Sequence, residues 1–293
     1  MKKSHVIKTT KYIAKQVMAP VFFRLILLLV LETITAFALS SVFAGLTEKL
    51  GVGWVISVWV FRIDLLAILL SLLAGLFLLP LSLGITEYLL KLVRRKEARI
   101  ADIFLWFADG EKLKRVFQYF LYTVALAVLT VPLYTVPSSY LLSTANAVLA
   151  DFSDQLTAGL AAVSLNWSLV DFRAVGICAV LLLVYALLSV KLLLTQYYFV
   201  DDDALSPFSA AYRSWRVMRG HALEFILLAL SFIGWYIACS LTVFIVALYL
   251  LPYLRMSVVI FTEYVRADHE LNRSPSPGGT VDSEIRDRGD KTE

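Results

Sequence analysis

The chain has 293 residues, of which 59% are hydrophobic and only 17% carry a charge. Soluble domains contain roughly 25% charged residues, so this composition excludes a soluble globular protein and indicates one whose apolar surface lies in a lipid bilayer. The formal net charge of +4 says little as a total, whereas the positions of the basic residues are informative.

Six apolar runs are each long enough to cross a bilayer as a helix, which needs about 20 residues at a rise of 1.5 Å per residue. The sequence therefore predicts an all-α, polytopic transmembrane bundle of about six spans, at residues 21–45, 63–90, 116–140, 173–199, 222–241 and 245–265. The last two spans come from one apolar stretch that is too long for a single crossing, and we place the turn around Ser240–Val243.

Basic residues predict the orientation of these spans. Lys and Arg gather before the first span, in the second linker (residues 91–115) and in the fourth linker (residues 200–221), while the 39 residues from Tyr134 to Phe172 contain none. Positive charge is retained on the cytoplasmic side, so both termini and these two linkers are expected in the cytoplasm. Cleavage of a signal peptide after Ala36-Phe37-Ala38 is the alternative interpretation of the first span.

The predicted spans and their orientation divide the chain into three regions. Residues 1–20 form a basic cytoplasmic N-terminal segment, residues 21–266 form the six-span membrane domain, and residues 267–293 form a polar cytoplasmic tail. The tail cannot bury enough apolar surface to fold, and we expect it to be disordered.

The second and fourth linkers each predict a basic amphipathic helix that lies in the headgroup plane on the cytoplasmic side. In the fourth linker Ser206-Pro207 is a typical helix start and Gly220 a typical stop, with Asp201, Asp202 and Asp203 upstream, where a helix N-terminus favours negative charge. The candidate residues for contact with anionic lipid headgroups are Arg213, Trp215, Arg216 and Arg219. In the second linker the apolar stripe is Ile100, Ile103, Phe104 and Phe107, beside Trp106. Simple anchoring by positive charge is the alternative for both helices.

Three ionisable residues lie deep within predicted spans, namely Glu32, Lys191 and Arg255. Charged groups at such depth are costly and mark either a function or a specific pairing. Their estimated depths are similar and their signs are opposite, so the sequence predicts an intramembrane polar cluster. This cluster serves either as a structural ion pair or as a site for a substrate or a proton.

The sequence contains no motif typical of a catalytic, metal-binding or cofactor-binding site. No predicted span contains His, the two cysteines Cys178 and Cys239 lie apart in apolar runs, and no phosphate-binding glycine loop or dinucleotide fingerprint occurs. We therefore expect no catalytic residues, no cofactor, no metal and no nucleic-acid partner. The protein is predicted to be non-enzymatic.

Several short segments carry a resemblance to a known family. They are Asp102-Ile103-Phe104, Asp203, Ser214 with Met218-Arg219-Gly220, Ser231-Phe232-Ile233-Gly234-Trp235 and Pro252-Tyr253. With these segments the chain resembles the bacterial integral membrane proteins of domain of unknown function 975. The resemblance implies a multi-span protein of the bacterial cytoplasmic membrane with no assigned activity and no defined catalytic residues.

The fifth predicted span also carries a candidate packing node at Ser231, Gly234 and Trp235. Small residues three apart on a membrane helix permit close approach of a second helix and an interhelical hydrogen bond. A large side chain at Gly234 is therefore expected to force two helices apart, while a ligand contact is the alternative role of this segment.

Two classes of function remain open. The first is a membrane scaffold, an envelope-stress protein or an export accessory protein, with the lipid bilayer as its surroundings and protein partners that the sequence does not name. The alternative is a transporter of a small molecule or peptide that uses the intramembrane polar cluster. An intramembrane hydrolase is a further alternative. A water-filled cavity that reaches the layer of Glu32, Lys191 and Arg255 favours the transporter, and a tightly packed core with an exposed surface on the inner helices favours the scaffold.

The first prediction concerns topology. We expect a cysteine introduced at Ser164 to react with a membrane-impermeant maleimide added outside intact cells, and a cysteine at Ser209 to react only after the cells are opened, because the basic linkers are retained inside. Labelling of both positions from the same side contradicts the six-span arrangement.

Overall fold

The structure is a computed structural model, and it describes residues 3–50, 55–58, 61–158, 164–242 and 245–271. Within these ranges six helical stretches are long and apolar enough to cross a membrane. They are His5–Lys49, Leu66–Val93, Gly110–Thr157, Phe172–Asp201, Pro207–Leu241 and Ala247–Leu271. The all-α class and the number of spans are thus confirmed. Most of the predicted tail, from residue 272 onward, lies outside the described residues.

The chain divides into two compact units, one of residues 27–215 and one of residues 1–26 and 216–293. The first unit contains most of α2 (Phe22–Leu50), then β1, β2 and α3 (Leu65–Val93), and continues through η2, α4, α5, η3, α6 and α7 into the start of α8. Their bounds are Val55–Val58 for β1, Phe61–Asp64 for β2, Ile100–Phe104 for η2, Leu105–Ala108 for α4, Gly110–Thr157 for α5, Trp167–Leu169 for η3, Phe172–Leu192 for α6, Thr195–Asp201 for α7 and Pro207–Leu230 for α8.

A short antiparallel hairpin precedes α3. β1 pairs with β2 so that Val55 lies opposite Asp64 and Val58 opposite Phe61. These strands of four residues each were not predicted, because they are far shorter than an apolar run that could cross a bilayer.

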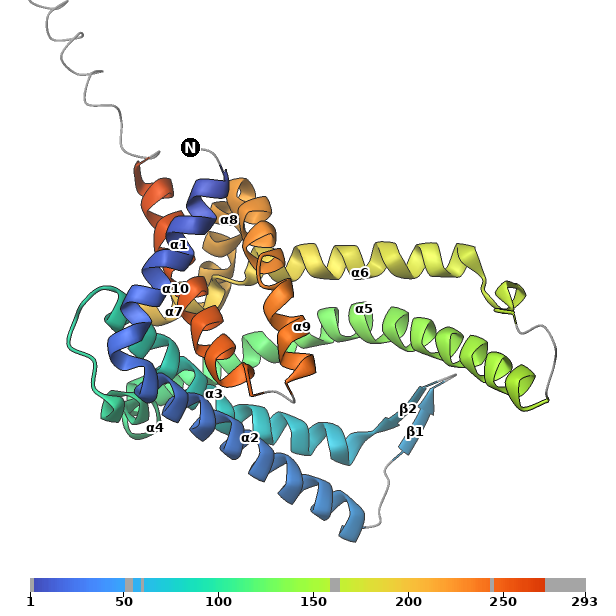
Figure 1. Cartoon of the computed structure of the whole chain (residues 1–293). Helices are drawn as coiled ribbons and strands as arrows, with labels where there is room; N and C mark the ends of the chain where they lie inside the picture. The colour runs from blue at the N-terminus through green and yellow to red at the C-terminus, as the bar shows by residue number, and fades with distance from the viewer. Residues whose placement is uncertain (1–2, 51–54, 59–60, 159–163, 243–244, 272–293) are drawn as a thin grey trace, which may run out of the picture. The chain divides into compact units, whose positions relative to one another are not determined.

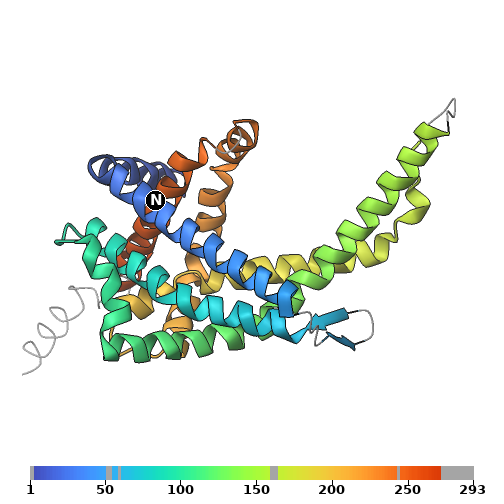
Figure 2. The same ribbon diagram turned by 90° about the horizontal axis from the view of Figure 1, so that it is seen from below.

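The helix α5 is much longer than the predicted third span. It has 48 residues, which corresponds to about 72 Å, whereas the hydrocarbon core of a bilayer is about 30 Å thick. It runs beside α6, as both views show (Figures 1 and 2). The helix thus continues beyond the predicted span, which ends near residue 140, because residues 138–157 contain neither Gly nor Pro.

The fourth predicted span is interrupted close to Lys191. The helix α6 ends at Leu192 and α7 begins at Thr195. Such a break leaves carbonyl groups at the helix end without an intrahelical donor. The hydroxyl of Ser214, which is fully buried, donates to the carbonyl of Lys191 at 2.7 Å and satisfies one of them.

The helix α8 passes through Gly220 without a break and continues to Leu230. The predicted stop at Gly220 was therefore wrong, since a single glycine inside a helix costs only about 1 kcal/mol, which the residues on both sides can offset. As a result the fourth linker and the beginning of the fifth span belong to one helix.

In the second unit α1 (Lys3–Met18) packs along α10 (Ala247–Leu271), as Figure 1 shows. The ammonium group of Lys11 donates to the carbonyl of Ser231 at 2.9 Å and lies 4.2 Å from the ring centre of Phe232. Phe232 in turn packs edge-to-face on Tyr253 of α10, with ring centres 5.2 Å apart. The basic N-terminal segment is therefore a packed helix.

The turn within the last apolar stretch lies where the sequence predicted it. The helix α9 (Ile233–Leu241) ends one residue after Ser240, and α10 begins at Ala247. The long apolar run is thus divided into two helices.

A close approach between the second linker and α3 occurs at Gly84. A Cβ atom built on Gly84 comes within 2.5 Å of the carbonyl oxygen of Ile103 and within 2.8 Å of its Cγ2. Ile103, in η2, is almost fully buried. Only a residue without a side chain lets η2 rest on α3 at this point.

We therefore expect Gly84→Ala to destabilise the protein by about 1–3 kcal/mol, because the new methyl group meets backbone atoms that cannot rotate away. Thermal unfolding in detergent measures the effect. Gly75→Ala is the matched control on the same helix, since a Cβ at Gly75 meets no atom within 4 Å. Equal melting temperatures for the two variants contradict the close approach.

Candidate functional site

The predicted intramembrane residues come from three different helices, two of them in one unit and one in the other. Glu32 is half-buried on α2, Lys191 is at the end of α6 with its ammonium group 6.0 Å from the ring centre of Trp215, and Arg255 is on α10 in the other unit. Each of the three makes an interaction in the structure. The energetic coupling expected between Glu32 and the two cations stays a prediction.

Glu32 faces a cleft of about 360 Å³ that α2, α3 and α5 enclose. Its walls are mainly apolar, with Leu72, Leu79 and Phe120 among the lining residues. The polar groups at its surface are those of Glu32, Ser71, Ser82 and Thr123. Clefts of 300–1,000 Å³ with apolar walls and a few convergent polar groups are typical of small-molecule sites.

Ser82 connects this cleft to α7. The amide nitrogen of Gln196 donates to the Ser82 hydroxyl at 3.0 Å and to the hydroxyl of Thr86, one turn further along α3, at 2.9 Å. Gln196 therefore ties α7 to the wall of the cleft.

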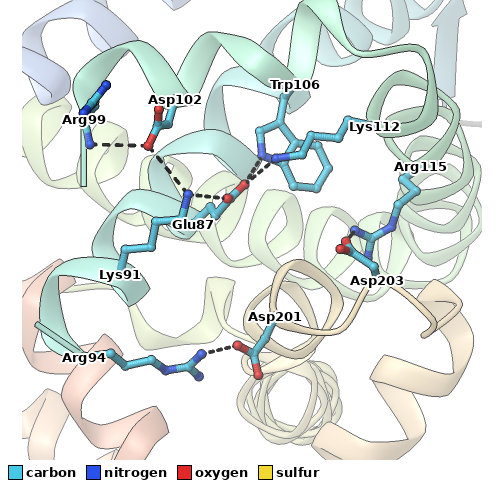
Figure 3. Close-up of polar contacts among 10 residues, drawn as sticks. All are labelled: Glu87, Lys91, Arg94, Arg99, Asp102, Trp106, Lys112, Arg115, Asp201 and Asp203. Atoms are coloured by element: carbon cyan, nitrogen blue, oxygen red, sulfur yellow. Dashed lines mark hydrogen bonds and ion pairs between the residues drawn. The ribbon is translucent and has the colours of Figure 1, made fainter. Parts of the chain in front are cut away.

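A second polar site, the junction, gathers the ends of α3, α5 and α7 with η2 and α4 (Figure 3). At its centre the carboxylate of Glu87 accepts three donors that come from three helices. Lys91 lies at 2.8 Å, the indole N–H of Trp106 at 2.7 Å and Lys112 at 3.0 Å. Trp106 is almost fully buried, so this hydrogen bond satisfies the polar atom of an otherwise apolar ring.

Two arginines of the junction pair with acidic residues at the end of α7 and just after it. Arg94 pairs with Asp201, and Arg115 pairs with Asp203 (Figure 3). Arg115 also donates to the backbone carbonyls of Phe199 and Asp202, the latter at 3.0 Å, and its guanidinium lies 4.5 Å from the ring centre of Phe199. The second linker and the fourth linker are thus held together by charge.

These contacts correct the prediction for the second linker and for the aspartates. Ile103 and Trp106 are buried inside the unit, and in place of a separate surface helix the segment forms η2 and α4, with Phe104 and Phe107 exposed. Asp201 and Asp203 pair with arginines far away in sequence, which their proximity to the start of α8 did not reveal. The sequence did contain a signal for this pairing, because the second linker is rich in basic residues and the fourth linker begins with three aspartates.

The candidate residues for the lipid interface are distributed over α8. Arg213 lies 3.8 Å from Asp202 and 5.4 Å from the ring centre of Tyr198, and Trp215 is about one-third exposed. Arg216 and Arg219 are exposed. Their contact with anionic headgroups stays a prediction.

The predicted packing node differs from its expectation at Gly234. Among the described residues, no atom lies within 4 Å of a Cβ built on Gly234, so the close approach expected there is not found. The hydroxyl of Ser231, in the turn between α8 and α9, donates to the carbonyl of Leu228 in the last turn of α8, and Trp235 packs on Tyr249 with ring centres 5.7 Å apart. A glycine is small enough for close contact wherever it stands, and among the described glycines such a contact is found at Gly84.

Six helices capable of crossing a bilayer, with charged residues paired at the ends of several, define a polytopic helical membrane protein. The family model described as "Protein of unknown function (DUF975)" matches residues 1–269, and the chain belongs to this family. Neither a curated protein nor a solved structure gives a match to the chain.

The junction generates a prediction about Arg115. Arg115→Met removes one ion pair and two hydrogen bonds to backbone carbonyls, and we expect it to lower the free energy of unfolding by about 1–3 kcal/mol. Thermal unfolding in detergent provides the measurement. Lys114→Met removes the same charge from an exposed neighbour and is expected to change stability by less than about 0.5 kcal/mol.

Arg115→Lys separates charge from geometry in the same experiment. A lysine keeps the positive charge but cannot donate to several oxygens in a fixed fork, so we expect only partial recovery. If Arg115→Met and Lys114→Met unfold at the same temperature, the junction does not stabilise the unit.

Proposed function

We propose that the chain is a non-enzymatic protein of the bacterial cytoplasmic membrane that transports a small amphipathic molecule. The observation that supports this function is the cleft at Glu32, which combines apolar walls with one carboxylate that the sequence places within a span. Ionisable groups at such depth mark substrate or ion pathways by default.

The arrangement of the walls suits a binding site. α3 and α5, which form two walls, are joined through Glu87, Trp106 and Lys112, and Gln196 connects α3 to α7. A site whose walls are held in place before the ligand arrives loses less conformational entropy on binding. The junction therefore supports the cleft as a preorganised site.

A scaffold or export accessory protein is the second candidate, and the junction is the observation that favours it. The ion pairs of Arg94 and Arg115 hold the second linker against the fourth and leave Phe104, Phe107 and Leu113 exposed beside it. These side chains could contact a protein partner or the lipid headgroup region. Binding of a small molecule in the cleft separates the two candidates.

Filling the cleft tests the transporter. Gly75 lines the cleft and has open space around its Cβ, so Gly75→Leu is expected to occupy the cleft without straining the helix. With the purified full chain in lipid nanodiscs, tritiated 4-phenylbutanol should bind the parent saturably and bind Gly75→Leu at least about tenfold more weakly, because the ligand's apolar contacts are lost.

Gly176→Leu is the matched control for this variant. Gly176, on α6, also has open space around its Cβ and does not line the cleft, so this variant should bind like the parent. Unchanged binding by Gly75→Leu, or no saturable binding by the parent, contradicts the proposed function. Exchange of the probe that is faster across proteoliposomes containing the parent than across protein-free liposomes, and the loss of this excess with Gly75→Leu, distinguishes a transporter from a fixed receptor.

A further inference from the structure

A second cleft lies between α2 and α3, nearer to the β1–β2 hairpin than the cleft at Glu32. It has a volume of about 250 Å³, and Ala44 and Thr47 of α2 and Ala67 and Ala74 of α3 are among the residues that line it. Ser71 lines both clefts, so the two open spaces adjoin at this side chain.

One face of α2 borders both clefts. Glu32 and Ala36 line the first, and Ser40, Ala44 and Thr47 line the second. These positions follow one another at steps of four or three residues, which places them on one side of a helix. From Glu32 to Thr47 this face is about 22 Å long at a rise of 1.5 Å per residue. Since α2 and α3 run next to each other toward the hairpin (Figures 1 and 2), the two clefts form one groove, here called the α2–α3 groove.

Small side chains line the part of the α2–α3 groove near the hairpin. Ala44, Ala67 and Ala74 border the second cleft. Such residues usually let two membrane helices pack closely. Here they border open space, and a Cβ atom built on Gly75, in the first cleft, meets no atom within 4 Å. The small side chains therefore leave room between the helices that a ligand can occupy.

The second cleft contains hydroxyl groups, and none of the described residues that line it is charged. Thr47 and Ser71 donate their hydroxyl hydrogens to the carbonyls of Ala44 and Ala67, each at 2.7 Å, which leaves the lone pairs of their oxygens to accept from a ligand. An amphipathic molecule with a hydroxyl group can thus pass here without meeting a charged group that it must desolvate.

The opposite end of the first cleft, toward the junction, is closed by buried side chains. Leu83, which follows the lining residue Ser82, is fully buried. Tyr119 stacks on the fully buried ring of Phe199 with ring centres 4.9 Å apart, and the guanidinium of Arg115 lies 4.5 Å from the same ring. A ligand in the first cleft therefore has open space toward the hairpin and packed side chains toward the junction.

We propose that a ligand enters and leaves the cleft at Glu32 along the α2–α3 groove, through the second cleft and from the end next to the β1–β2 hairpin. In the predicted orientation this end lies on the extracytoplasmic side. The inference names the route by which a substrate reaches the site of the proposed transporter, and it rests on that function.

A reversible block of the groove tests this route. The two native cysteines are buried, and both are replaced by alanine in the parent chain of this experiment. Ala44→Cys is then introduced, because Ala44 lines the second cleft and not the first. Benzyl methanethiosulfonate attaches a benzylthio group to the new cysteine through a disulfide bond, and dithiothreitol removes it.

The label should separate passage from binding. In proteoliposomes we expect labelled Ala44→Cys to lose the excess exchange of tritiated 4-phenylbutanol at least about tenfold, because the benzyl group fills the route. In nanodiscs, after long incubation, its affinity for the probe should stay within about twofold of the unlabelled variant, because the first cleft is unobstructed. Dithiothreitol should restore the exchange.

Two further variants control for position. Val42→Cys places the same label on an exposed residue of α2 that lines neither cleft, and its exchange should not change. Ala74→Cys places the label on α3 in the second cleft only, and it should block exchange as Ala44→Cys does. Ala74→Cys also provides the test if Ala44→Cys does not fold.

The outcomes separate this inference from the function on which it rests. Unchanged exchange by labelled Ala44→Cys and labelled Ala74→Cys overturns the route and keeps the transporter. Loss of equilibrium binding together with exchange assigns Ala44 to the binding site itself and also overturns the route. Absence of saturable binding by the parent overturns both proposals.

Discussion

The carboxylate of Glu87 lies near the end of a strongly apolar helix, where an ionised group is stable only when donors surround it. Lys91, Trp106 and Lys112 supply those donors from α3, α4 and α5, so that three helices meet at one charge. Removal of any one of these donors leaves a partly buried carboxylate with too few hydrogen bonds and too little positive charge around it. The fold of the second linker follows from this constraint, because Trp106 reaches Glu87 only if η2 lies on α3, and Gly84 provides the room.

The same helix serves both the junction and the cleft. On α3, Ser82 belongs to the wall of the cleft and Glu87 to the junction, little more than one turn away. Gln196 bonds to Ser82 on the cleft side, and its helix α7 ends at Asp201, which pairs with Arg94. A ligand in the cleft would therefore contact helices that the ion pairs of the junction hold in place. A shift of α3 or α7 at one site would move the same helix at the other site.

Hydropathy predicted six spans and the turn after Ser240 because a bilayer imposes a minimum length on any apolar helix. It could not predict the full length of α5, because residues 138–157 are helical through the absence of breakers and not through apolar character. The pairing of Arg94 with Asp201 joins residues 107 positions apart, which one sequence cannot reveal. The cleft escaped prediction for a related reason, since small and apolar residues of three helices form it and only Glu32 was conspicuous.

The basic residues of the second linker can serve two purposes, namely ion pairing at the junction and retention of the linker on the cytoplasmic side. Residues 91–115 contain eight basic and four acidic side chains, and an excess of that kind predicts retention on the cytoplasmic side. Had the junction neutralised all of the basic side chains, that signal would depend on charges hidden in the fold. Instead the junction pairs Lys91, Arg94, Lys112 and Arg115, while Arg95, Lys96, Arg99 and Lys114 remain exposed. The paired set holds the walls of the cleft and the exposed set keeps the linker basic, so the proposed binding and the predicted orientation can both be specified by one segment without conflict.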